Sequence, residues 1–125
     1  MKKGFFALII LLLILGLGIG ELFYLNHTYN TMKDRMSEVR NMIEREDAES
    51  YTAVVSAKEW WNEKKALLET LVSHNETKEM TLRLSELEGY VAIDDQKSAV
   101  ATVAIIIELC ENTVNTLYLD WDTIM

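Results

Sequence analysis

A long uncharged apolar segment at the N-terminal end constrains the fold of this chain more than any other feature. Residues 4–20 read GFFALIILLLILGLGIG, and after Glu21 the largely apolar residues 22–25 follow. A helix rises about 1.5 Å per residue, so residues 4–25 extend to about 33 Å. The hydrocarbon core of a bilayer is about 30 Å thick. The sequence therefore predicts a transmembrane helix over residues 4–25 that contacts membrane lipid.

The charges on either side of this segment predict its orientation. Lys2 and Lys3 precede it, and all 20 acidic residues of the chain follow it. Basic residues mark the cytoplasmic side of a membrane span. We therefore expect a cytoplasmic stub and anchor at residues 1–25, in a single-pass protein of the cell membrane whose C-terminal domain lies outside the cytoplasm.

Other interpretations of the segment remain open from the sequence. Gly18 and Gly20 resemble the small residues of a signal-peptidase site, so a cleaved signal peptide is the main alternative to an anchor. The start of the chain also resembles a type IV pilin leader, although that family has a glutamate where this chain has Ile9. Gly16 and Gly20 have the spacing of helices that pack closely in membranes, which makes them the candidate seam of a homodimer.

The rest of the chain predicts helices throughout. It has no proline, and residues that favour helices, such as Leu, Glu, Ala and Lys, are prominent. Residues 26–31 are polar and poor helix formers, so we expect a short juxtamembrane linker there. Residues 32–125 remain for an extracytoplasmic helical bundle, enough for one small core.

Apolar residues of this domain recur every three or four positions, which is the spacing of one helical face. Breaks are expected near Asp47, His74 and Asp94, with Asp47 and Asn75 as caps of the second and third helices. The predicted inward residues are Met32, Met36, Val39 and Ile43; Val54, Ala57, Trp61, Leu68 and Leu71; Met80, Leu84, Leu87 and Val91; and Ala99, Val103, Ile106, Cys110, Val114, Leu117 and Trp121. The expected fold is all-α, an N-terminal transmembrane helix followed by a four-helix bundle of two helical hairpins.

A shift of 48 residues relates the two hairpins. Residues 32–47 and 80–95 are identical at five of sixteen positions, and their four apolar stripe positions stay apolar. This pattern predicts a helical-hairpin repeat over residues 32–79 and 80–125. Chance similarity between two amphipathic helices is the alternative.

The chain offers little for catalysis or for nucleic acid binding. From residue 21 onward it has 10 basic and 20 acidic residues, a net charge of −10 that phosphate backbones repel. A metal site needs three or four ligands, whereas only His74 and Glu76 are close in the sequence. The lone Cys110 lies on a buried stripe, where a small apolar role is expected. We expect no enzyme, no cofactor, no metal and no nucleic acid partner.

Two features are candidates for contact with a protein partner. Trp60 points about 100° away from the inward Trp61, so it either covers the edge of the bundle or anchors a partner. His74 and Glu76 lie at a helix junction, where they either stabilise the helix ends or contact a partner. The expected function is a membrane-anchored interaction module that docks an envelope protein. A ligand-sensing bundle that acts through a membrane partner is the alternative.

Several short features together resemble the family named domain of unknown function 4363. They are the lysine-rich start with its apolar span, Glu46-Asp47, Trp60-Trp61, His74-Asn75-Glu76, Leu84 with Leu87, and Asp94-Asp95. The resemblance covers nearly the whole chain. It implies a bacterial, membrane-anchored helical protein and brings no known activity, so it assigns no catalytic residue.

We predict that the full-length protein pellets with membranes and resists extraction at alkaline pH, because residues 4–25 span the bilayer. Protease added from outside should digest the acidic body. Recovery of a soluble form that begins at Glu21 would show instead that the segment is a cleaved signal peptide.

Overall fold

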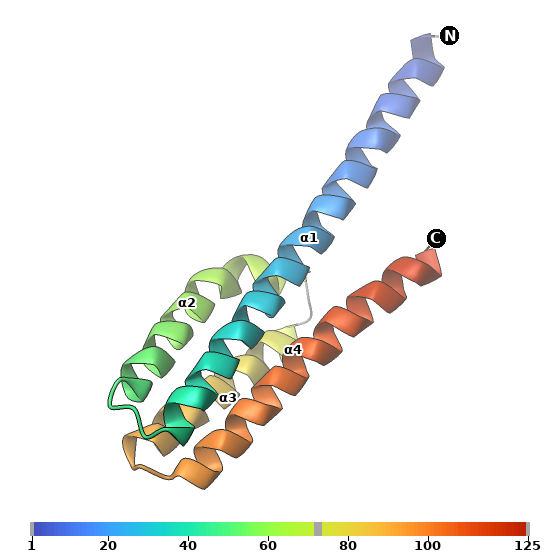
Figure 1. The fold of residues 1–125 in the computed structure, drawn as a ribbon. Helices are drawn as coiled ribbons and strands as arrows, with labels where there is room; N and C mark the ends of the chain where they lie inside the picture. The colour runs from blue at the N-terminus through green and yellow to red at the C-terminus, as the bar shows by residue number, and fades with distance from the viewer. Residues whose placement is uncertain (1, 72–73, 125) are drawn as a thin grey trace.

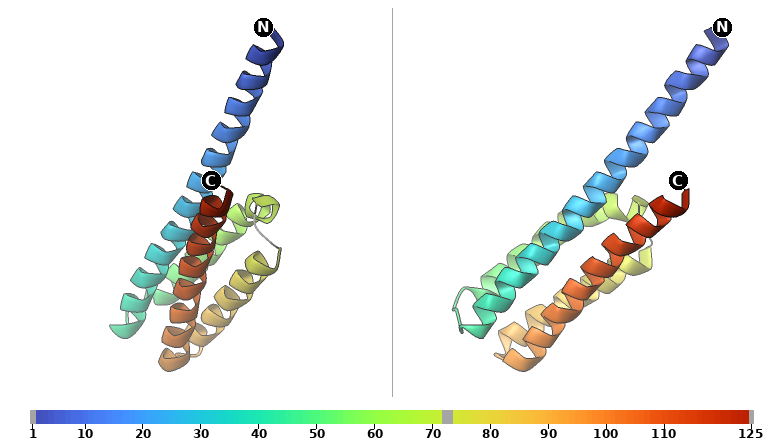
Figure 2. Two further views of the ribbon diagram at one scale, coloured as in Figure 1. Left: turned by 90° about the vertical axis from the view of Figure 1, so that its right-hand side faces the viewer. Right: turned by 45° about the vertical axis from the view of Figure 1, so that its right-hand side comes forward.

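The computed structural model describes residues 2–71 and 74–124, with side chains for residues 2–70 and 75–116. Within these residues four helices follow one another: α1 (Lys2–Glu44), α2 (Ser50–Leu71), α3 (His74–Ala92) and α4 (Gln96–Ile124) (Figure 1). The C-terminal half of α1 packs against α2 and α4, and α3 packs against the same two helices. The result is an antiparallel four-helix bundle, as predicted from the four apolar stripes (Figure 2).

The N-terminal half of α1 extends beyond the bundle (Figure 2). Its apolar side chains are exposed, including Phe5 at 65% and Leu17 at 69%. By length and composition, α1 and residues 96–116 of α4 are both apolar enough to span a membrane. The stretch in α4 is 33% buried inside the bundle, whereas the apolar window of α1 has no buried part. The exposed surface of α1 is therefore the one suited to lipid.

The predicted apolar stripes form the core of the bundle. Val91 and Val114 are half-buried and pack against it. The side chains of Leu71, Leu117 and Trp121 lie outside the described residues. All other predicted inward residues are buried: Met32, Met36, Val39, Ile43, Val54, Ala57, Trp61, Leu68, Met80, Leu84, Leu87, Ala99, Val103, Ile106 and Cys110.

Cys110 is one of the buried core residues. Burial raises the pKa of its thiol to about 12, so the thiol stays protonated at neutral pH. A protonated, buried thiol is a poor nucleophile and packs as a small apolar group, which is the role the sequence indicates.

The break predicted at residues 26–31 is wrong, because α1 passes through this stretch without interruption. Leu25, Thr28 and Tyr29 are buried there. The Thr28 hydroxyl donates to the Tyr24 carbonyl at 2.7 Å, so this polar side chain is satisfied within its own helix. Packing against the bundle thus outweighs the weak helix propensity of the stretch. The core begins at Leu25.

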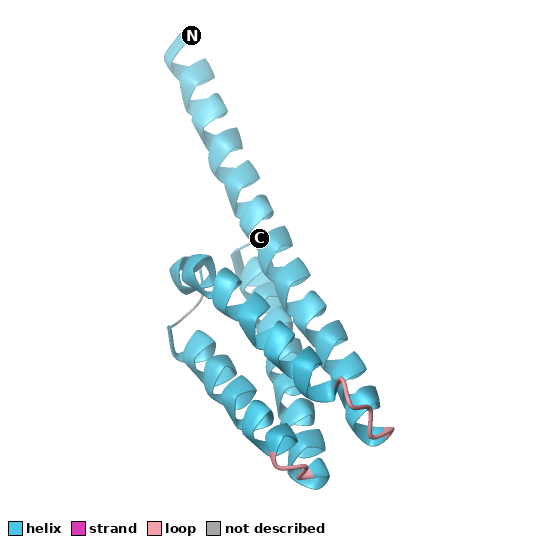
Figure 3. Cartoon of the chain, turned by 90° about the vertical axis from the view of Figure 1, so that its left-hand side faces the viewer, coloured by secondary structure: helices cyan, strands magenta, loops and turns pink. Residues whose placement is uncertain are grey.

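Two turns of the same geometry, both at one end of the bundle, join α1 to α2 and α3 to α4 (Figure 3). Glu46 and Asp94, which are 48 residues apart, hold left-handed conformations with φ of 55° and 57°. In each turn the next amide donates to the carbonyl five positions back, at 2.9 Å in both. This is the hydrogen bond of a Schellman motif, which closes the C-terminus of a helix. The turns thus share the 48-residue period of the sequence.

An aspartate follows each left-handed residue and holds the start of the next helix. Asp47 Oδ1 accepts the Glu49 N–H at 2.9 Å, as expected for the predicted cap of α2. Asp95 Oδ1 accepts the Ser98 N–H at 3.2 Å at the start of α4. Each turn therefore ends one helix and begins the next with two acidic residues in a row.

Replacing Leu87 with Ala should lower the free energy of unfolding by about 2–5 kcal/mol, because a cavity is left in the core. Leu82→Ala is the matched control, since it deletes the same atoms from a side chain on α3 that is 51% exposed, and it should cost much less. Met36→Ala should cost as much as Leu87→Ala. Denaturant unfolding of the full chain in micelles measures all three, and a neutral Met36→Ala would show that α1 is not part of the bundle.

Candidate functional site

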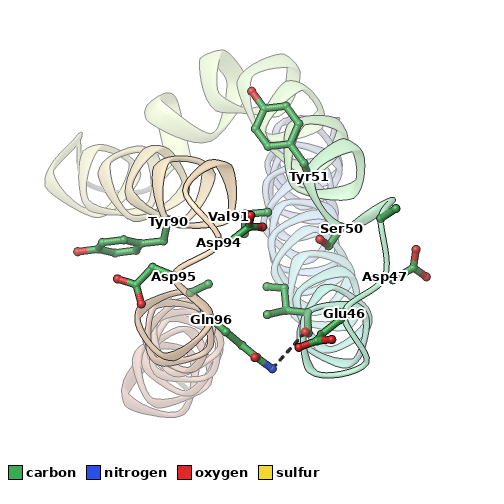
Figure 4. A pocket seen from close by; sticks show the side chains of 12 residues that line it. Glu46, Asp47, Ser50, Tyr51, Tyr90, Val91, Asp94, Asp95 and Gln96 are labelled. Carbon is green, nitrogen blue, oxygen red and sulfur yellow. Dashed lines mark hydrogen bonds between the residues drawn. The ribbon is translucent and has the colours of Figure 1, made fainter.

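The two turns lie at the end of the bundle farthest from the N-terminus of α1 (Figure 1). Residues of both turns line a pocket. Its volume is about 390 Å³. Six of its lining residues come from the stretch 43–51 and six from the stretch 90–99, and these two sides face each other across the pocket (Figure 4). We call this cavity the distal pocket. All four helices contribute to it, because each has one end here.

The floor of the distal pocket is apolar. Ile43 and Ala99, which line it, are buried core residues, and Val91 between them packs against the core. Tyr51 and Tyr90 also line the pocket. The Tyr51 hydroxyl donates to Glu88 Oε1 at 3.4 Å, which holds this ring against α3. The pocket is thus an opening into the end of the hydrophobic core.

One side-chain hydrogen bond crosses the pocket. Gln96 Nε2 donates to the Ile43 carbonyl oxygen at 3.3 Å (Figure 4). That carbonyl belongs to the last turn of α1 and also accepts the Glu46 N–H at 3.1 Å, so the Gln96 amide is its second donor. The bond therefore ties the start of α4 to the end of α1 and fixes the distance between the two hairpins.

Negative charge lies beside the opening, with the Asp47 and Asp95 carboxylates pointing away from the space between the two sides of the pocket (Figure 4). Glu46, Asp47, Asp94 and Asp95 line the pocket, and its described lining contains no lysine, arginine or histidine. The Glu49 amide N–H holds the pKa of Asp47 below its ordinary value, and Arg45 adds to this effect. The negative ends of the α1 and α3 dipoles and the positive ends of the α2 and α4 dipoles meet at this end, so the charge here comes from the side chains. The pocket therefore favours a cationic group.

The structure places the sequence-predicted site residues away from the distal pocket. Trp60 on α2 is half-buried and packs against the core. The Arg35 guanidinium of α1 lies 5.1 Å from the centroid of its ring, a cation–π contact. This contact occupies one face of the indole and favours the role of covering the edge between α1 and α2.

The residues at the α2–α3 junction are only partly described. α3 begins at His74, so Asn75 lies in its first turn and not at the cap position predicted for it. The His74 side chain lies outside the described residues. Glu76 is exposed in the first turn and lines a second cavity. Among the residues with described positions, no group of three or more His, Cys, Asp or Glu side chains is arranged to hold a metal ion.

Gly16 and Gly20 lie on the part of α1 that extends beyond the bundle. A Cβ atom added at either residue would meet nothing within 4 Å. Within the part of the chain that the structure describes, this side of the helix is therefore open along the predicted seam.

The profile of the family described as domain of unknown function (DUF4363) matches residues 20–124. The chain belongs to this family. The match begins at the end of the apolar segment and includes the whole bundle, so the resemblance seen in the short motifs is confirmed. No curated protein and no solved structure matches the chain.

The distal pocket of this DUF4363 chain was not predicted from the sequence, although its acidic residues were noticed as helix breaks. The signal that locates it is the pair Glu46-Asp47 and Asp94-Asp95, separated by one repeat length. In a bundle of two hairpins, the turns inside the two hairpins lie at the same end. The four carboxylates must then meet at that end.

In the DUF4363 bundle, Asp47→Ala should lower the melting temperature at neutral pH, because it removes the oxygen that caps α2. Folding lowers the pKa of Asp47, so its contribution is present above the ordinary carboxyl value of about 3.9 and is lost as the pH falls through the lowered value. Thermal unfolding measured from neutral to strongly acidic pH should show that the difference in melting temperature between wild type and Asp47→Ala decreases as the pH falls. Asp47→Asn keeps a side-chain oxygen that can accept the Glu49 N–H, so its melting temperature at neutral pH should fall less than that of Asp47→Ala. A gap that stays constant at all pH values would contradict this account.

Proposed function

We propose that this protein is a membrane-anchored helical module that binds another protein of the cell envelope through the distal pocket. The observation that carries the proposal is the character of that pocket. An apolar floor continuous with the core lies beside four acidic residues, at the end of the bundle farthest from the apolar segment. Apolar centres within polar rims are typical of protein interfaces.

The topology supports this choice of site. Lys2 and Lys3 before the apolar segment favour a cytoplasmic N-terminus, with the bundle outside. The helix from Leu25 to Ile43 is then about 27 Å long, so the distal pocket lies well clear of the lipid headgroups. A partner approaching from the envelope meets this end of the bundle first.

The surface beside the pocket also suits a protein partner. Ile93, in the turn between α3 and α4, is 71% exposed, and Tyr51 on α2 is 44% exposed. Large exposed apolar side chains next to a cavity act as anchors when a partner excludes water from them. The carboxylates select a partner with a basic surface and repel an acidic one.

A ligand-sensing bundle that acts through a membrane partner is the second candidate. The cavity lined by Glu76 favours this second function, because it lies between helices and is also lined by Tyr29, whose hydroxyl is buried. The residues that line this cavity belong to α1, the start of α3 and the later turns of α4. These parts of the helices lie at the other end of the bundle from the distal pocket (Figure 1).

We predict that a photo-crosslinking phenylalanine analogue at position 93 captures a discrete partner in intact cells. The same analogue at position 82 is the matched control, because Leu82 is also exposed on this hairpin but lies eleven positions before Ile93, about 16 Å along α3 from the turn beside the pocket. The double variant Glu46→Gln, Asp94→Asn removes two charges and leaves both helix-capping aspartates intact. It should abolish the crosslink from position 93. Equal capture from both positions, or capture from position 93 that the double variant does not reduce, would exclude the distal pocket as the docking site.

A further inference from the structure

A second cavity lies between α1, α3 and α4, beside the junction of α2 with α3. Its volume is about 230 Å³. Tyr29 of α1, Glu76, Glu79 and Met80 of α3, and Leu109 of α4 are among its lining residues. We call it the proximal cavity, because Tyr29 follows the end of the apolar segment by only four residues.

Tyr29 makes this cavity unusual. The residue is 1% exposed, and its hydroxyl has no hydrogen-bond partner among the described residues. Its ring meets the Trp61 ring edge-on, with centroids 6.0 Å apart and an angle of 61° between the planes. A phenylalanine would make the same ring contact without an unpaired hydroxyl. Buried polar groups are nearly always paired in folded proteins, so this hydroxyl points to a partner that comes from outside the chain.

The charge around the hydroxyl indicates the chemistry of that partner. Two carboxylates, Glu76 and Glu79, line the cavity, and its described lining has no basic residue. Arg83 pairs with Glu79 at 3.1 Å from outside the cavity lining. Burial, and after it the negative charge of Glu76, raise the pKa of the Tyr29 hydroxyl. The hydroxyl therefore stays neutral in a negative field, where its oxygen suits an N–H donor that carries positive charge.

We propose that the proximal cavity binds a primary ammonium group. The Tyr29 oxygen accepts one N–H, Glu76 balances the charge, and the adjoining carbon atoms pack against Met80 and Leu109. Amide and hydroxyl groups of α4, at Asn112, Thr113 and Thr116, complete the lining for further hydrogen bonds. A small amine of a few heavy atoms fits the volume.

The position of the cavity allows two sources of this group. Four helical residues separate Tyr29 from Leu25, a rise of about 6 Å, which brings the cavity near the headgroup layer if residues 4–25 span the bilayer. The ammonium group then belongs either to an ethanolamine lipid headgroup or to a free small amine. This inference does not depend on the distal pocket, so either proposal can fail alone.

The test uses the full chain in phosphatidylcholine nanodiscs, with the melting temperature followed by circular dichroism. If the site takes a free amine, ethanolammonium chloride should raise the melting temperature. Tetramethylammonium chloride at the same concentration has the same charge but no N–H donor, so it should not. Replacing part of the lipid with phosphatidylethanolamine distinguishes the sources: a rise in those discs alone assigns the site to lipid, and a rise with free ethanolammonium assigns it to a soluble amine.

Tyr29→Phe is the decisive variant. Because the hydroxyl is unpaired, the variant should melt at the same temperature as wild type or higher without amine, and it should lose the ammonium-dependent rise. Glu76→Gln should weaken that rise. The proposal is overturned if neither ammonium source raises the wild-type melting temperature, if tetramethylammonium acts equally, or if Tyr29→Phe keeps the full rise. A lower melting temperature of Tyr29→Phe without amine would also overturn it, by showing that buried water already satisfies the hydroxyl.

Discussion

The continuity of α1 determines how the rest of the molecule is arranged. One helix from Lys2 to Glu44 carries the exposed apolar segment and one quarter of the bundle. Its buried stripe begins at Leu25, the last residue of the apolar segment. Residues 21–44 of α1 include neither glycine nor proline. Kinks in helices usually occur at such residues. The bundle is therefore held to the apolar segment as one stiff unit, with the distal pocket directed away from it.

A central layer of polar and aromatic contacts then joins the helices to α1. Trp61 is fully buried, and its Nε1 donates to the Thr81 hydroxyl at 3.0 Å, which links α2 to α3. The Thr81 hydroxyl in turn donates to the Thr77 carbonyl at 2.9 Å. The Tyr29 ring brings α1 to the same layer. Because the indole N–H is satisfied, this tryptophan fixes the relative positions of the helices as well as filling space. The Tyr29 hydroxyl is the one buried side-chain polar atom without a partner in the described part of the chain.

The sequence predicted well whatever depends on helical period alone. Met36, Leu84 and Ile106 were placed correctly because a residue in a bundle is buried once per turn, whatever the loops do. Residues 26–31 were misassigned because local propensity was weighed without the partners that bury Thr28 and Tyr29. Their burial depends on the positions of α3 and α4. No local sequence pattern encodes those positions.

The two cavities were not predicted for a related reason. The distal pocket depends on two turns 48 residues apart being held side by side, and the bond from Gln96 to the Ile43 carbonyl that spans them has no sequence signature. The proximal cavity depends on Tyr29, which belonged to the stretch interpreted as a linker. Of the predicted contact residues whose side chains are described, Trp60 and Glu76, only Glu76 lines either cavity, and it was selected for its place at a helix junction. Periodicity thus predicts which residues form a core but not where that core is left open.

The left-handed residues of the two turns show a local conflict between stability and charge. Glycine adopts this conformation without steric cost, whereas a residue with a side chain is destabilised there by about 1 kcal/mol or more. The chain nevertheless has Glu46 and Asp94 at these positions, once in each hairpin. Sequences that depart from the locally favoured residue usually do so where another property is needed. A bundle selected for stability alone would favour glycine at both positions, so the acidic pair lowers the stability of the fold and, under the proposed function, supplies charge for contact with a basic partner.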